Sequence, residues 1–148
     1  PYESTKLMQN RYAWKPASVP FERTYRMISN LDDRYENGIH DLMKFVKFGY
    51  GRATDHSSKD IRYGDMTRET AIAMVRKYDH VVSGDLQYWL EYVEMTEGEF
   101  WRTADTFRSP KVWWIEKGQW WKDNIWGVPS SYGTVHLPAD SWAKYNRA

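Results

Sequence analysis

Hydrophobic residues recur every three or four positions through the middle of the chain, which is the spacing that gathers them on one face of an α-helix. The pattern predicts four helical stripes, whose inward residues are Leu42, Phe45, Val46 and Gly49; Ala71, Met74, Val75 and Tyr78; Leu86, Trp89, Leu90 and Val93; and Phe100, Trp101, Ala104 and Phe107. Because each stripe needs a partner to bury it, we expect the helices to pack on one another in a mainly α domain.

Polar residues mark where these helices begin and end. Asn30 predicts one N-cap and Thr67 predicts another. Thr96 and Glu99 have the spacing of a capping box, in which a hydroxyl and a carboxylate each satisfy an orphan amide. Pro110 is expected to end the helical part, because proline cannot donate the next helical hydrogen bond.

The pattern changes after this proline. Two aromatic runs, residues 112–115 and 119–121, flank a short segment that contains Gly118. Aromatic runs separated by a glycine-containing turn are typical of a β-hairpin. We therefore expect a short hairpin rich in tryptophan to follow the helices.

The two ends of the chain lack a sustained period. Residues 1–28 are interrupted by prolines, and residues 127–148 hold glycine, proline and serine without a repeat. The sequence thus predicts a mainly α, single domain of four to five packed helices with a short Trp-rich β-hairpin over residues 29–126. An irregular lead-in is expected over 1–28 and an irregular C-terminal tail over 127–148.

Composition narrows the class of protein. The 148 residues include 9 Trp, 11 Tyr and 5 Phe, enough aromatic surface to build a core, so disorder of the whole chain is excluded. With a net charge of +1, the chain has no strong electrostatic field that would attract nucleic acid or an anionic membrane. With no cysteine, disulfides and thiolate metal sites are excluded. No apolar run approaches the ~20 residues of a membrane span, and we expect a cytoplasmic protein without nucleic-acid or membrane partners.

The candidates for a functional site lie in one charged stretch, residues 47–64, with the sequence KFGYGRATDHSSKDIRYG. It could lie within one helix over residues 41–62, or break at Gly49-Tyr50-Gly51, since two glycines cost a helix roughly 2 kcal/mol against alanine. Glycine also lets another backbone or a ligand approach closely. The stretch is therefore expected to serve either packing or binding.

Two interpretations of its charges stay open. In the first, the residues form a solvated face held by ion pairs such as Arg52–Asp55 and Asp55–Lys59. In the second, the cations hold a phosphorylated ligand, because arginine offers a bidentate fork and lysine a point charge. His56, next to Asp55, could then act as an acid–base group or orient the ligand.

Other chemistries lack support in the sequence. The four histidines, at positions 40, 56, 80 and 136, have no metal-binding spacing. No GxxxxGK[ST] phosphate loop and no GxSxG nucleophile elbow occurs. The pattern therefore identifies no catalytic residue, and we expect no metal site.

Two longer stretches carry a family resemblance. NLDDRYENGIHDLMKFVKFGYGRATDHSSKDIRYGDMTRETAIAMVRKYDH and LEYVEMTEGEFWRTADTFRSPKVWW resemble the C-terminal region of the N-acetyl sugar amidotransferases. This family makes lipopolysaccharide and related surface glycans and includes the pseudaminic acid type. The resemblance covers roughly residues 12–126.

The resemblance implies an ATP-dependent transfer of glutamine-derived ammonia onto the acetamido carbonyl of a nucleotide-linked sugar. The ATP-pyrophosphatase domain of the family, with its Ser-Gly-Gly-x-Asp-Ser loop, is N-terminal and is absent from this sequence. The chain is therefore expected to be the C-terminal fragment of such an enzyme, to hold no cofactor itself and to be inactive alone. Its implied partners are an ATP-pyrophosphatase domain, a glutaminase subunit and the nucleotide sugar.

Residues that match the family pattern become the candidate substrate-binding set: Lys47, Arg52, Asp55, His56 and Arg62. The expectation is that the three cations contact the diphosphate or carboxylate of the nucleotide sugar, with Asp55 and His56 orienting them. Alternatively, the same block docks on the ATP-pyrophosphatase domain. A different class stays open too: a helical structural or interaction module without catalytic activity, which binds a protein partner or forms a homo-oligomer.

Overall fold

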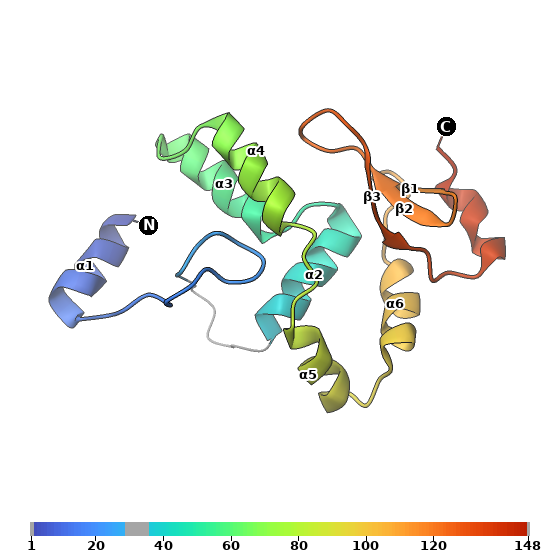
Figure 1. Cartoon of the computed structure of the whole chain (residues 1–148), viewed down its shortest axis with the longest axis horizontal. Helices are drawn as coiled ribbons and strands as arrows, with labels where there is room; N and C mark the ends of the chain where they lie inside the picture. Colours follow the sequence, from blue (N-terminus) through green and yellow to red (C-terminus); the bar gives the residue numbers. More distant parts are fainter. Residues whose placement is uncertain (1, 29–35, 148) are drawn as a thin grey trace.

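The computed structural model describes residues 2–28 and 36–147 of the chain. The elements of these residues follow one another as α1 (Tyr2–Tyr12), α2 (Glu36–Phe48), α3 (Arg52–Tyr63), α4 (Arg68–Tyr78), α5 (Asp85–Tyr92), α6 (Glu97–Asp105), β1 (Trp113–Glu116), β2 (Gln119–Lys122), β3 (Ser130–Thr134) and the 3-10 helix η1 (Ala139–Tyr145). The mainly α class is confirmed (Figure 1). No helix among these residues is both long and apolar enough to cross a bilayer.

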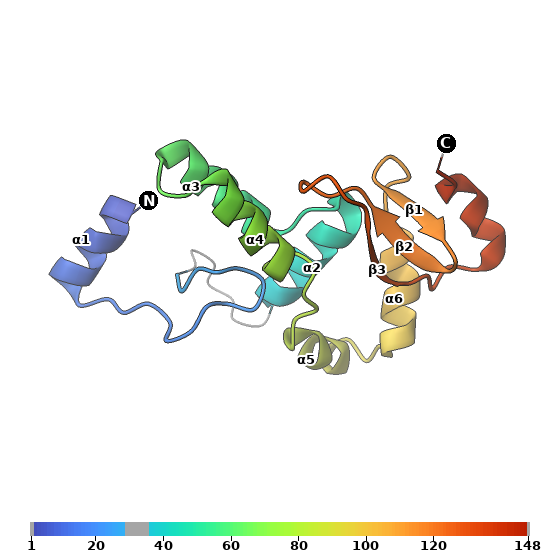
Figure 2. The ribbon, with the colours of Figure 1, turned by 45° about the horizontal axis from the view of Figure 1, so that its top comes forward.

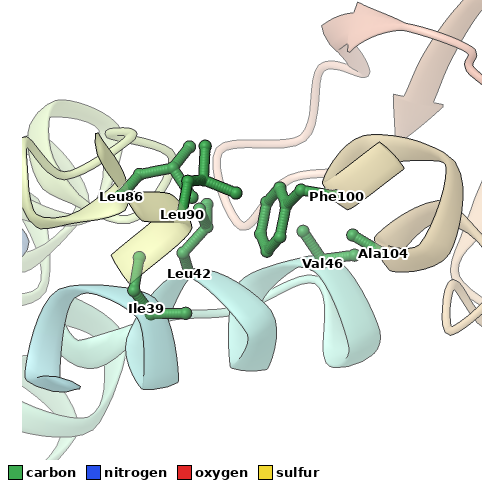
Figure 3. Close-up of a cluster of buried hydrophobic side chains, with 7 residues drawn as sticks. All are labelled: Ile39, Leu42, Val46, Leu86, Leu90, Phe100 and Ala104. Carbon is green, nitrogen blue, oxygen red and sulfur yellow. The ribbon is translucent and has the colours of Figure 1, made fainter. Parts of the chain in front are cut away.

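Helix α2 lies at the centre of the molecule and packs against α5 and α6 on one side. The first core is made there by side chains from all three helices, which point toward one another (Figure 3): Ile39, Leu42, Val46, Leu86, Leu90, Phe100 and Ala104. All of these residues except Ile39 belong to the stripes that the sequence predicts. Val93 and Phe107 were also expected to face inward but are exposed, because α5 ends at Tyr92 and α6 ends at Asp105.

The other side of α2 supports the sheet. Phe45 joins a second core formed with residues of the sheet and of the segment that follows it: Trp113, Trp120, Val135, Leu137 and Tyr145. The predicted hairpin is present, with Glu116 paired to Gln119. Lys117 and Gly118 at its tip have φ values of 51° and 73°, as a two-residue type I′ turn requires.

The tail is more ordered than the sequence suggests. β3 adds to β2 as an antiparallel third strand, in the order β1-β2-β3, and η1 covers the sheet. Burial of Val135, Leu137 and Tyr145 holds this segment in place. Val135 and Leu137 are two residues apart, but two positions are too few to predict a strand, so the sequence pattern does not indicate this segment.

Helices α3 and α4 form an antiparallel pair, and they lie side by side in both views (Figure 2). Gly64 ends α3 with a φ of 79°, and its amide bonds the carbonyl of Ile61. The predicted cap of α4 is confirmed, because Thr67 accepts a hydrogen bond from the amide of Thr70 at 3.2 Å. The capping box of Thr96 and Glu99 is also confirmed, whereas Asn30 lies outside the described residues.

Helix α1 lies in a region that was predicted to be irregular. An irregular lead-in over residues 1–28 is wrong for Tyr2–Tyr12, because Pro16 and Pro20 lie beyond this helix and do not interrupt it. Its described side chains are exposed apart from Thr5, and both views place it away from the other helices. The domain boundaries themselves stay a prediction.

Candidate functional site

The block KFGYGRATDHSSKDIR folds into a sharp corner between two helices. α2 ends at Phe48 and α3 begins at Arg52, so a continuous helix over residues 41–62 is wrong. Gly49 has a φ of 74°, and a Cβ there would lie 2.5 Å from Cγ1 of Val112. At Gly51 a Cβ would lie 3.0 Å from the carbonyl oxygen of Asp79. Both glycines therefore serve close approach, as their pattern suggests. We call residues 44–56 the α2–α3 corner.

The N-terminus of α3 is capped by a residue distant in sequence. The carboxylate of Asp79 accepts hydrogen bonds from the amide of Gly51 at 2.8 Å and the amide of Thr54 at 3.1 Å. The hydroxyl of Thr54 also donates to it, at 2.5 Å. A helix N-terminus attracts an anion because its amides are unpaired and its dipole is positive there. Asp79 supplies that anion from within the chain.

The five candidate binding residues fall into two groups. Arg52, Asp55 and His56 lie in the first turns of α3, and Lys47 lies nearby in the last turn of α2. Arg62 is at the other end of α3, ten residues and about 15 Å along the axis from Arg52. The structure thus brings four of the five to the corner and leaves Arg62 apart.

The ion pairs at the corner join the two helices. Arg52 makes a bidentate contact with Asp41 of α2, through Nε at 2.9 Å and Nη2 at 2.7 Å. Lys44 of α2 pairs with Asp55. These pairs replace the expected Arg52–Asp55 and Asp55–Lys59 pairs, because the break at the glycines turns α3 back toward α2. Among the described residues, the exposed Lys47 and Arg62 make no ion pair.

His56 faces the N-terminal segment rather than solvent. Its Nδ1 lies 2.6 Å from Oγ1 of Thr24. Burial, together with the nearby charges of Arg26, Arg52 and Lys59, lowers the pKa of His56 to about 4. His56 is therefore neutral at pH 7, where it can exchange a hydrogen bond but cannot serve as a cation.

A recess opens between this corner and the sheet. Gly49, Tyr50 and Thr54 of the block form part of its wall. The remaining lining residues come from α2, from α4 and the residues after it, and from the sheet with its β2–β3 loop: Phe45, Val75, Asp79, His80, Lys122, Asn124, Ile125, Trp126 and Tyr132. The loop reaches toward α4 in both views, and Arg76 lies 5.7 Å from the ring centre of Trp126. We call this space the Lys122 recess.

Lys122 is the functional candidate that the sequence analysis missed. Its exposed fraction is 8%, and its Nζ donates to the carbonyl of Asp123 and to Oδ1 of Asn124, both at 2.8 Å. The hydroxyl of Tyr132 donates to the same Asn124 oxygen at 2.5 Å. No described carboxylate lies within ion-pair distance of Lys122, and burial lowers its pKa.

A signal for Lys122 was present in the alternation of β2. Side chains two residues apart on a strand share a face, so Lys122 lies on the same face as the fully buried Trp120. A lysine at an inward position of an aromatic strand is unusual, because burial of a charge is costly. The hairpin was interpreted from its tryptophans alone, and Lys122 was not considered.

The site offers cations and hydrogen-bond donors rather than a reactive centre. Lys47 and Arg52 present positive charge at the corner, and Lys122 presents it inside the recess. In the part of the chain that the structure describes, no three His, Asp or Glu side chains gather as they would around a metal ion. The arrangement suits recognition of an anionic ligand.

Comparison with known families gives one match. A family model described as "LPS biosynthesis protein WbpG-like, C-terminal domain" matches residues 22–125. The matched region includes α2 to α6 and the hairpin of β1 and β2, and thus the corner and Lys122. No curated protein matches the chain.

Proposed function

Because the chain belongs to the WbpG-like C-terminal domain family of lipopolysaccharide biosynthesis proteins, we propose that it is the nucleotide-sugar-binding portion of an N-acetyl sugar amidotransferase. In this reaction the acetamido carbonyl oxygen is activated at the expense of ATP and is displaced by ammonia, which leaves an acetamidino group. The finer assignment to amidotransfer rests on the resemblance of the KFGYGRATDHSSKDIR block. As expected from the sequence, the reaction would take place in the cytoplasm.

ATP activation is assigned to another domain. The glycine turn of the corner leads into α3, but the first amides of this helix are already bonded to Asp79. A nucleotide phosphate could bind them only by displacing that buried carboxylate. The chain therefore does not fit an ATP phosphate loop, and we propose that an ATP-pyrophosphatase domain and a glutaminase supply activation and ammonia. The chain alone would be inactive.

The observation that carries the proposal is the gathering of the family block at one corner beside a recess. Lys47 and Arg52 lie within one helical turn on either side of the glycines. Arg52 is oriented by Asp41 through Nε and Nη2, and its side chain keeps an exposed fraction of 21%, so it is fixed and partly accessible. A fixed arginine favours phosphate recognition because less side-chain entropy is lost on binding.

The test is calorimetric titration of the chain with a UDP-linked diacetamido sugar at low salt. We expect a dissociation constant in the micromolar range, weakened about tenfold in Lys47→Met or Arg52→Ala, because each removes a phosphate contact. Lys111→Met is the matched control, since Lys111 is exposed and distant in sequence from the block. Arg62→Ala reports whether the ligand extends along α3. Equal affinity in all variants would contradict the proposal.

A second candidate function is docking of the corner on a protein partner. Phe48 and Tyr50 at the corner have exposed fractions of 48% and 42%, and their ring centres are 6.1 Å apart. Exposed aromatic residues next to cations are typical of protein interfaces. In that case Phe48→Ser would abolish a complex with the ATP-pyrophosphatase domain in sedimentation experiments, while the isolated chain would show no heat with sugar nucleotide.

A further inference from the structure

We propose that the Lys122 recess is an anion-binding pocket, in which the ammonium group of Lys122 holds a carboxylate or a phosphate group of a small ligand. The pocket is separate from the candidate residues of the corner, since none of Lys47, Arg52 or Arg62 lines it. It does not depend on the proposed function, because simple anions can test it directly.

Lys122 has no ion-pair partner among the described residues. A buried ammonium group costs several kcal/mol unless a counter-charge or a full set of acceptors compensates it. Two of its three hydrogens are used, by the carbonyl of Asp123 and the amide oxygen of Asn124, and both acceptors are neutral. The Tyr132 ring, whose centre is 5.4 Å from Nζ, and the charges of Asp79 and Asp123 offset part of the cost. Neither carboxylate accepts a hydrogen bond from Nζ, so one donor remains, and an anion in the recess would satisfy it.

The carboxylate that lines the recess already has hydrogen-bond partners. Asp79 lines the recess, but its carboxylate is bonded to the amides of Gly51 and Thr54 and to the Thr54 hydroxyl. It is not within ion-pair distance of Lys122. Asp79 raises the pKa of Lys122 only from beyond ion-pair distance, so we expect a ligand to supply the direct ion-pair partner.

The size and polarity of the recess suit a small anion. The recess has a volume of about 50 Å³, which admits a carboxylate or the terminal oxygens of a phosphate but not a whole nucleotide. Phe45, Val75 and Trp126 provide apolar walls, and a low dielectric strengthens an ion pair. The imidazole of His80 also lines the space. Burial lowers the pKa of His80, which favours the neutral ring. A neutral imidazole keeps one N–H that could donate to an anion.

The experiment is titration of the full chain at low ionic strength with three probes: sodium phosphate, sodium acetate and neutral N-acetylglucosamine. We expect one of the two anions to bind with a millimolar dissociation constant, and the stronger of them identifies the group as phosphate or carboxylate. Lys122→Met should weaken this binding at least tenfold, and Lys111→Met should leave it unchanged. Binding of the neutral sugar alone, or equal anion affinity in both variants, would overturn the proposal.

A second measurement on the unaltered chain covers the case in which Lys122→Met does not fold. An anion beside an ammonium group raises its pKa and leaves less of the reactive free amine. Acylation of Lys122, followed by mass spectrometry, should therefore slow severalfold when the anion is added, while acylation of Lys111 keeps its rate. An unchanged rate at Lys122 would overturn the proposal. Sugar-nucleotide binding that survives Lys122→Met would leave the proposed function intact.

Discussion

At the scale of single residues, Asp79 has the largest predicted effect on stability. Its carboxylate is buried and caps α3 through Gly51 and Thr54. We predict that Asp79→Ala lowers the free energy of unfolding by about 3 kcal/mol, because charged hydrogen bonds are lost and buried amides are left unpaired. Urea unfolding followed by circular dichroism measures this. Asp65→Ala, at an exposed position in the α3–α4 turn, is the control; a similar small loss in both variants would contradict the capping role.

His56 gives the fold a predicted sensitivity to acid. Its folded pKa of about 4 lies below the unfolded value of 6.5, so the unfolded chain binds the proton more readily. The stability that the neutral ring contributes is thus complete above pH 6.5 and is lost as the pH falls toward 4. The groups that face the ring are Thr24, Tyr25, Arg26, Arg52, Lys59 and Asp60.

We predict that His56→Gln makes the chain less sensitive to acid, because glutamine can keep a bond to Thr24 and does not titrate. The measurement is the urea midpoint at pH 7 and at pH 5 for both chains. The wild type should lose more of its midpoint on acidification than the variant. Equal losses would show that protonation of His56 does not oppose folding.

At the scale of elements, the break between α2 and α3 depends on Gly49. Alanine there meets two penalties: a positive φ, which costs about 1 kcal/mol or more, and a contact of 2.5 Å with Val112. Gly64 is the matched control, since it has a similar φ and no atom within 4 Å of a Cβ. We predict that Gly49→Ala destabilises the chain by about 2 kcal/mol more than Gly64→Ala, as measured by urea unfolding. Equal destabilisation in the two variants would mean that the positive φ alone, and not the contact with Val112, causes it.

The elements also show which features of the sequence can be read directly. The stripes of α2, α5 and α6 and the capping box of Thr96 and Glu99 are local patterns, so they predict the helices correctly. The break at the corner was predicted only as one of two alternatives. The sequence shows that two glycines disfavour a helix there, but the contacts that require glycine, with Val112 and Asp79, are made by residues distant in sequence.

At the scale of the whole molecule, the features that escaped prediction are those made by distant parts of the chain. The segment of β3 is held in place because Val135 and Leu137, which follow the strand, pack in the same core as Phe45. Nothing near them in the sequence indicates that contact. The Lys122 recess likewise requires β2, α4 and the corner to meet. The candidate residues Lys47, Arg52, Asp55 and His56 gather because they are neighbours in sequence, whereas Lys122 comes close to Gly49 of the corner only through the fold.

The N-terminal segment divides into a part that the fold does not use and a part that it requires. Arg23 is buried and donates to the carbonyls of Asp79 at 2.5 Å and Asp41 at 3.2 Å. Arg26 pairs with the buried Asp60, and the Tyr25 hydroxyl donates to the same carboxylate. These residues bind α2, α3 and α4 together, and the family match begins at residue 22, just before them.

We predict that removal of residues 1–15 leaves the free energy of unfolding within about 0.5 kcal/mol, because almost all described side chains there are exposed. Removal of residues 1–27 should lower it by about 3 kcal/mol or more, since Asp60 would remain as a buried charge without its partners. Urea unfolding of the two shortened chains measures the difference. If both kept the stability of the full chain, the α3–α4 pair would have to be held by its own contacts with α2, and Arg23 and Arg26 would be dispensable.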